Sequence, residues 1–118
     1  MKTWTAVGTV LGCVALHGCA PAAGEAQRIE RGQRLLAQYQ CGACHSIPQV
    51  PAARGGVGPP LERWRGRSYI AGHLPNRADT LARWIAEPQA LVPGTAMPDM
   101  GVSDVDARAM AAYLMSLE

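Results

Sequence analysis

The chain has 118 residues, enough for one small domain, and its 13 Gly, 9 Pro, lack of Phe and aromatic content of 5% leave few residues for a large apolar core. Domains of this size usually need disulfides, a metal or a partner to be stable. The formal net charge of +2 gives no support for a nucleic-acid partner.

Charge is distributed unevenly along the sequence. Between Arg28 and Arg83, arginine greatly outnumbers acidic residues, whereas after Arg83 aspartate and glutamate predominate. We therefore expect an electrically polar molecule, with an arginine-rich segment that faces an acidic patch on its partner.

Residues 1–18 are predicted to be a signal peptide of the lipoprotein type. Lys2 precedes an uncharged, mostly apolar or small run from Thr3 to Gly18, which is typical of an export signal. The run is short for a transmembrane helix, which needs about 20 apolar residues. In Leu16-His17-Gly18-Cys19 we expect cleavage before Cys19 and acylation of its thiol. The mature protein would then be exported and lipid-anchored on the periplasmic, extracytoplasmic face of the cell membrane, with residues 19–25 as a tether.

Two alternatives for this leader stay open. Cys13 is a second candidate for lipidation, and Ala20-Pro21-Ala22 is an ordinary cleavage site that would leave a soluble product. His17 departs from the lipoprotein pattern, in which a small or β-branched residue is usual. With Cys13 removed and Cys19 acylated, only two cysteines remain, so no structural disulfide is expected.

A single domain is predicted over residues 26–118, beginning with a helix from about Ala26 to Tyr39. Its apolar residues approximate one helical stripe: Ile29, Leu35, Leu36 and Tyr39. Gly32 interrupts this helix, and an interior glycine costs about 1 kcal/mol relative to alanine. Either Gly32 is merely tolerated, or another helix crosses there with an aromatic ring against the backbone, for which Tyr113 is the candidate.

The stretch Cys41-Gly42-Ala43-Cys44-His45 has the attachment signature of a c-type haem. The two thiols add across the vinyl groups of the porphyrin, and the following histidine supplies the proximal nitrogen to the iron. A structural zinc site would need four ligands, and no second Cys/His pair follows. A thioredoxin-like pair belongs in a βαβ unit, which the sequence does not indicate. We therefore predict one covalently bound haem (heme c) that forms much of the core.

An irregular segment rich in Gly and Pro follows, from Ser46 to Ser68. Long loops in compact domains usually serve a function, and here we expect the loop to wrap one edge of the haem. The carbonyl of Pro59 is a candidate acceptor for the Nδ1 proton of His45, and Leu61 for packing on the porphyrin face. Arg67 is the main candidate to bind the haem propionates. Arg63, Arg65 and Tyr69 are weaker candidates, and the alternative for each arginine is a solvated surface charge, which the sequence favours for Arg63 and Arg65.

A second helix is predicted to start near Asn76 and to end before Pro88, with Trp84 on its apolar face. The next loop, Pro93-Gly94-Thr95-Ala96-Met97-Pro98, presents a thioether between two prolines. Methionine usually fills space in a core, but this rigid loop favours Met97 as the sixth iron ligand, since a His/Met pair is what cytochromes c use. Met100 and then His73 are the alternatives.

A closing helix is predicted to run to about Leu117. Ser103 and Asp106 at its start approximate a capping box. Its apolar residues lie on one face: Met110, Tyr113, Leu114 and Leu117.

These segments together resemble class I cytochromes c over residues 29–117. The likeness is carried by the Cys41–His45 motif, Gly58-Pro59-Pro60-Leu61, the run from Leu81 through Pro88, and the Met97 loop. It implies an all-α, small cytochrome c fold, with about three main helices and long loops around one haem. It also implies His45 and Met97 as axial ligands and Trp84 in the distal pocket. The segment 69–76 is most similar to cytochrome domains that accompany bacterial haem–copper oxidases.

The resemblance implies a monohaem electron carrier rather than an enzyme. It would work in a respiratory chain with a terminal oxidase or another respiratory complex, as a monomer or as a subunit of a larger complex. The alternatives are a haem subunit of a periplasmic dehydrogenase, or a ligand-binding haem enzyme or sensor with labile Met97 ligation. An enzyme would need an open coordination position and a distal acid–base pair, and His73 is the only spare histidine after the leader.

Overall fold

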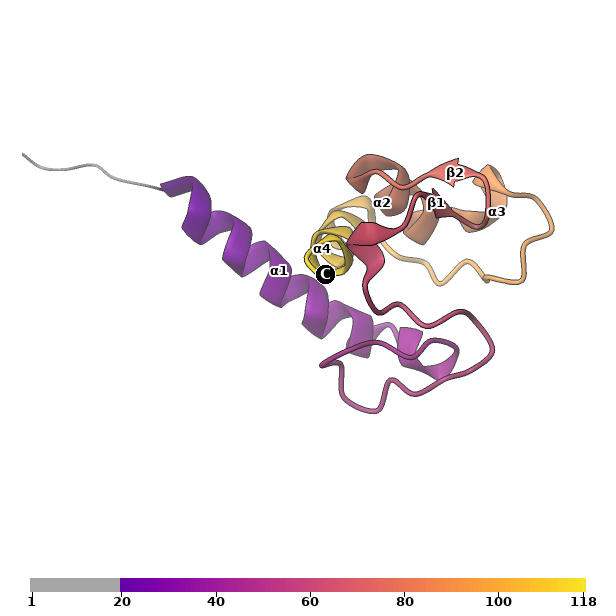
Figure 1. The fold of residues 1–118 in the computed structure, drawn as a ribbon, viewed down its shortest axis with the longest axis horizontal. Coiled ribbons are helices and arrows are strands. Elements are labelled where there is room, and N and C mark those ends of the chain that lie inside the picture. Colours follow the sequence, from indigo (N-terminus) through magenta and orange to yellow (C-terminus); the bar gives the residue numbers. More distant parts are fainter. Residues whose placement is uncertain (1–19) are drawn as a thin grey trace, which may run out of the picture.

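The computed structural model describes residues 20–118, with side chains described from Ala23 onward, so the predicted signal peptide and Cys19 lie outside the described residues. Three helices carry the fold: α1 (Ala20–Gln38), α2 (Ala78–Ala86) and α4 (Asp104–Met115) (Figure 1). Between them lie short elements, namely η1 (Cys41–Ala43), η2 (Trp64–Gly66), β1 (Tyr69–Ile70), β2 (Leu74–Pro75) and α3 (Pro88–Leu91). The fold is thus mostly helical, as predicted, with one two-stranded antiparallel sheet. None of the helices in the described part is long and apolar enough to cross a membrane.

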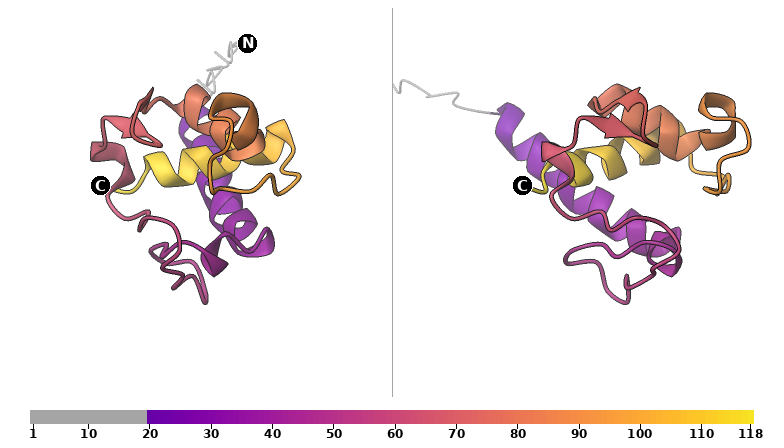
Figure 2. Two further views of the ribbon diagram at one scale, coloured as in Figure 1. Left: turned by 90° about the vertical axis from the view of Figure 1, so that its right-hand side faces the viewer. Right: turned by 45° about the vertical axis from the view of Figure 1, so that its right-hand side comes forward.

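Helices α1 and α4 cross, as both views in Figure 2 show, and their closest approach includes Gly32. A Cβ atom added to Gly32 would lie 1.9 Å from the carbonyl oxygen of Ala109 and 3.0 Å from the Cβ atom of Tyr113. The crossing expected at Gly32 is therefore present, but its closest contact is the backbone of Ala109 rather than an aromatic ring. The hydroxyl of Tyr113 instead donates a 2.6 Å hydrogen bond to the carbonyl of Pro48.

A polar contact joins the same two helices beside the crossing. Arg31 and Tyr39, both from the first-helix region, donate to the carboxylate of Asp106 in α4, and the Tyr39 bond is 2.9 Å long. Donation of this hydrogen bond to Asp106 raises the pKa of the Tyr39 hydroxyl above its usual value, because the bond stabilises the protonated form; burial and the negative charge of Asp106 act in the same direction. The crossing is thus held by close backbone packing and by a shared acceptor.

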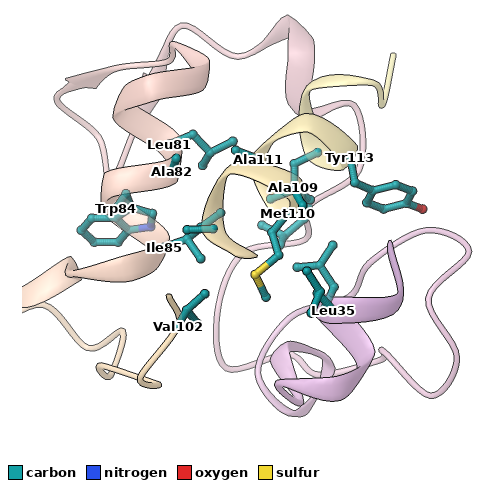
Figure 3. Packing of buried hydrophobic residues seen from close by; sticks show 14 of the residues in the cluster. Leu35, Leu81, Ala82, Trp84, Ile85, Val102, Ala109, Met110, Ala111 and Tyr113 are labelled. Carbon is teal, nitrogen blue, oxygen red and sulfur yellow. The ribbon is translucent and has the colours of Figure 1, made fainter. Parts of the chain in front are cut away.

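The core lies between α1, α2 and α4 and is apolar. Figure 3 shows side chains from all three helices gathered in it, including Leu35, Ile85 and the fully buried Met110. No charged or polar residue of the described part is buried. Three of the six buried residues of α4 are alanines, and these small side chains let α1 approach closely.

Helix α1 begins six residues earlier than the sequence pattern predicts. Residues 20–25, expected as a tether, continue the helix. Their alanines are strong helix formers, and Pro21 lies in the first turn, where a missing N–H costs no intrahelical hydrogen bond. The helix stops at Gln38, and Gln40 then takes a left-handed conformation with φ of 56°.

The expected start of the second helix at Asn76 is wrong by two residues. Helix α2 begins at Ala78 with Arg77 as its N-cap, because the Asn76 side chain bonds to other partners, described below. The helix ends before Pro88, as predicted, and Pro88 itself begins α3, which the sequence pattern did not indicate. The closing helix is capped as predicted, since the Ser103 hydroxyl accepts a 3.2 Å bond from the Asp106 amide. It ends at Met115, two residues earlier than expected.

Candidate functional site

A cavity of about 280 Å³ lies between the Cys41–His45 turn, the following loop, α2 and the Met97 loop. It is lined mostly by apolar groups: Leu36, Cys41, Cys44, His45, Val57, Gly58, Pro59, Leu61, Trp64, Ala71, Leu81, Trp84, Ile85, Thr95, Ala96, Met97, Pro98 and Leu114. The predicted residues that border this cavity are Cys41, Cys44, His45, Pro59, Leu61, Trp84 and Met97; the candidates for the propionates, Arg67 and the weaker Arg63, Arg65 and Tyr69, do not. A larger hollow of about 980 Å³ lies between α1, α2 and α4, but its rim is mainly charged, and of all these residues only Arg65 borders it. The chemistry of the smaller cavity makes it the candidate site.

The Cys41–His45 turn is built by short backbone hydrogen bonds after the end of α1. The amide of His45 donates to the carbonyl of Cys41 at 3.0 Å, so both thiols and the imidazole come from one tight turn. Gly42 packs against the returning loop, and a Cβ there would lie 2.5 Å from the Cα of Ala53. Both cysteines are free and partly buried, and burial raises the pKa of the Cys41 thiol. The turn is therefore held in place from outside as well as by its own hydrogen bonds.

The imidazole of His45 is oriented by the loop, as predicted. Its Nδ1 atom lies 2.8 Å from the carbonyl oxygen of Pro59, which can only accept, so Nδ1 carries the proton. The Nε2 atom is then left with a free lone pair for a metal. Gly58 makes this approach possible, because a Cβ on it would lie 2.3 Å from Cε1 of the ring.

This donor set fits a covalently attached haem better than the other CxxC sites. The two thiols follow a helix rather than a strand, which differs from a thioredoxin-like pair. In residues 20–118, no group of three or more His, Cys, Asp or Glu side chains converges as in a structural zinc site. What the cavity does offer is two thiols, one imidazole nitrogen, one thioether and apolar walls.

The loop that carries Met97 is fixed by Gln89 of α3, a residue that sequence reasoning missed. The Gln89 side-chain nitrogen donates to the carbonyls of Thr95 (2.8 Å) and Met97 (3.0 Å), and its oxygen accepts from the amide of Gly94 (3.1 Å). Met97 is partly buried and borders the cavity. Of its two alternatives, Met100 is 44% exposed, and neither Met100 nor His73 lines the cavity.

Trp64 is the second residue that sequence reasoning missed, and it forms part of the cavity wall. It is 5% exposed, and its indole N–H donates a 3.0 Å hydrogen bond to the side-chain oxygen of Asn76. The amide nitrogen of Asn76 donates in turn to the carbonyls of Trp64 and Arg67, each at 3.0 Å. The Asn76 side chain thus fixes both the Trp64 indole and the backbone that leads to β1. A tryptophan shortly after the Pro59-Pro60 pair is the signal that could have indicated this wall.

The arginines proposed for the propionates lie outside the cavity lining. Arg67 lies over the Trp64 ring, 4.8 Å from its centroid, and donates to the carbonyls of Pro60 and Glu62. Arg65 pairs with Glu118 at 3.4 Å and borders the larger hollow. Arg54 is exposed and follows Ala53, which packs against Gly42 of the Cys41–His45 turn. Contact of Arg67 with a propionate stays a prediction.

Comparison with known proteins agrees with this geometry. Residues 27–114 match the family model described as "Cytochrome C oxidase, cbb3-type, subunit III". The chain is 34% identical to "Cytochrome c oxidase subunit 2" of Alkalihalophilus pseudofirmus over 75% of its own length, and spans about a quarter of that relative, 25%. It is also similar to "Cytochrome c2 iso-2" of Magnetospirillum fulvum, at 36% identity over 65% of this chain and 91% of that relative. The corresponding protein of Magnetospirillum molischianum is 32% identical, over 66% of this chain and 91% of that protein.

Proposed function

The chain belongs to the class I, monohaem c-type cytochromes, and we propose that it carries single electrons in a respiratory chain, to or from a terminal oxidase or another respiratory complex. It is an electron-transfer protein rather than an enzyme, and it holds one haem c through Cys41 and Cys44. When bound, the haem supplies a one-electron couple, and a His/Met ligand pair raises its potential.

The observation that carries the proposal is the joint placement of His45 and Met97. They come from separate loops and border the same apolar cavity; the Pro59 carbonyl holds the His45 imidazole, and the Gln89 side chain of α3 holds the Met97 carbonyl. We assign them as the two residues that would ligate the haem iron. With both bound, no coordination position would be left for an exogenous ligand; an electron carrier needs such a closed site, whereas a haem enzyme needs an open position. Leu61, Trp84 and Ile85 are buried and give the cavity an apolar wall.

Carbon monoxide binding tests this proposal directly. The reduced protein should show a reversible one-electron couple and should not bind carbon monoxide, because Met97 fills the sixth position. Ready binding by the unmodified reduced protein would mean an open position, and the catalytic or sensing alternatives would replace the carrier.

An oxidase or related respiratory complex is the proposed partner, supported by the family description and by the name of one relative. Reduced protein added to membranes of the source cell should be oxidised rapidly in a cyanide-sensitive way. Oxidation that cyanide leaves unchanged would contradict an oxidase as acceptor.

The arginine-rich segment is proposed to steer this encounter, and Arg54 is its best-placed member beside the haem-attachment turn. Exposed charges are screened over about 8 Å at physiological ionic strength, so electron transfer should slow as salt rises. Arg54→Glu should slow it at low salt, whereas Arg108→Glu, the same charge change at an exposed position that borders the larger hollow, should have a smaller effect. A flat salt dependence would favour an apolar contact instead.

The protein is further proposed to be exported and held at the membrane by a lipid on Cys19. The basic start, the apolar run and the Leu16–Cys19 stretch support this. Export also agrees with the haem-attachment motif, since thioether attachment in bacteria is completed outside the cytoplasmic membrane.

A further inference from the structure

The Met97 loop has few backbone-to-backbone hydrogen bonds, and the Met97 amide makes only a long, 3.4 Å bond to the Thr95 hydroxyl. Among the described residues, the only backbone-to-backbone hydrogen bond made by residues 93–101 joins the Thr95 amide to the Val92 carbonyl at 3.1 Å. The loop also contains Gly94 with a positive φ of 81°, a conformation that favours glycine. Backbone pairing therefore does little to fix the direction in which Met97 points.

Gln89 supplies the missing hydrogen bonds. Its single amide group binds three backbone groups of the loop, one each on Gly94, Thr95 and Met97. The bond to the Met97 carbonyl is the most direct, because it fixes the peptide plane next to the Cα atom that bears the thioether. Only an amide side chain both donates two hydrogens and accepts one in this way.

The segment that carries Gln89 is anchored in the core, and the Gln89 amide with its three hydrogen bonds is called the clamp below. Gln89 follows Pro88, one of the most deeply buried side chains of the protein, and both lie in the single turn of α3. The Gln89 side chain itself is exposed, so the clamp lies on the outer side of the loop while Met97 borders the cavity. A residue in this position contributes little to the core, and its side-chain hydrogen bonds go to the loop.

We propose that Gln89 is a positioning residue for the sixth ligand: its amide holds Met97 at the iron and so determines how easily an external ligand displaces it. This inference rests on the proposed assignment of Met97 as the axial ligand. Gln89 is then the residue that keeps the sixth coordination position closed.

Imidazole is a suitable probe, because it competes for the sixth position of oxidised haem. The holoprotein is titrated with imidazole as wild type, Gln89→Ala and Gln89→Glu, with Gln38→Ala as the matched control on the exposed end of α1. Losing three hydrogen bonds should raise imidazole affinity on the order of tenfold or more. Gln89→Glu should act in the same direction, since a carboxylate cannot donate to the two carbonyls. Gln38→Ala should match the wild type.

Two further measurements separate positioning from general stability. Without imidazole, both Gln89 variants should keep the weak far-red band of a sulfur–ferric bond, because the ligand is loosened but not removed. Hydrogen exchange of the Gly94 amide should be faster in Gln89→Ala than in wild type, whereas thermal unfolding should change little for so exposed a side chain.

The far-red band distinguishes a failure of the Gln89 proposal from a failure of the Met97 ligand assignment. If the wild type has the far-red band and the Gln89 variants bind imidazole no more tightly than it does, the role of Gln89 is wrong while the ligand assignment stands. If the wild type lacks the band, the ligand assignment is wrong, and the role of Gln89 fails with it.

Discussion

Gly32 lies so close to Ala109 that a Cβ atom at residue 32 would fall 1.9 Å from the Ala109 carbonyl oxygen. Alanine in an open helix position gains about 1 kcal/mol over glycine, but overpacking typically costs roughly 1–3 kcal/mol, occasionally more. We expect Gly32→Ala to be destabilised by about 2 kcal/mol or more, as measured by denaturant unfolding of the holoprotein.

Gly24 provides the matched control for this change. It lies in the same helix, and a Cβ there would meet nothing within 4 Å. Gly24→Ala should therefore be neutral or slightly stabilising. Equal stability of Gly32→Ala and wild type would show that the helices can separate at no cost.

Gly58 should be equally intolerant, for a reason that concerns the site. A methyl group there would overlap the His45 ring, with Cβ 2.3 Å from Cε1, and would push the imidazole from the Pro59 carbonyl. Losing such an orienting partner typically weakens metal binding by roughly tenfold or more. The measurement is the fraction of six-coordinate, low-spin iron in the oxidised protein, which should fall in Gly58→Ala. Gly56→Ala is the control, since a Cβ on Gly56 meets nothing within 4 Å, and a matching loss there would refute the steric argument.

Met97→Ala should open the sixth coordination position. The neutral, soft thioether favours reduced iron, so the potential should fall, the far-red sulfur–ferric band should vanish and carbon monoxide should bind. Met100→Ala should leave all three properties nearly intact, because Met100 is 44% exposed and does not border the cavity. The reverse pattern in the two variants would assign the ligand to Met100.

Cys19→Ser should release the protein from the membrane while the haem domain still folds. Each buried CH₂ of an acyl chain contributes about 0.8 kcal/mol, so a multiply acylated cysteine resists washing with salt. Fractionation in high salt should leave wild type with the membranes and the variant in the supernatant, both with the same haem spectrum. A wild-type protein that washes off, or a mature chain that starts at Ala23, would contradict lipidation at Cys19.

Local patterns predicted the helices, the haem-attachment turn and the Met97 loop, because periodicity and short motifs carry that information. The Ser103 cap was predictable for the same reason. The roles of Gln89 and Asn76 were not, since each depends on backbone groups that only tertiary folding brings within reach. Asn76 reads locally as a helix start, but bonding to Trp64 takes its side chain away from α2. Arg67 likewise lies over the Trp64 ring, which no spacing rule indicates.

Because α1 starts at Ala20, residues 20–25, which were expected to form a tether, are part of a continuous helix. Its 19 residues, at about 1.5 Å per residue, make a rod of roughly 28 Å, whose first turns extend away from the other elements (Figure 1). If the lipid is on Cys19, the haem-attachment turn lies at the far end of this rod, so the length of α1 fixes the distance between the turn and the start of the helix next to the lipid. A Gly/Ser-rich replacement of residues 20–25 should then change the rate of electron transfer in membranes but not between freely dissolved proteins. If the replacement changes the rate of electron transfer in neither setting, the helical start of α1 does not control electron transfer at the membrane.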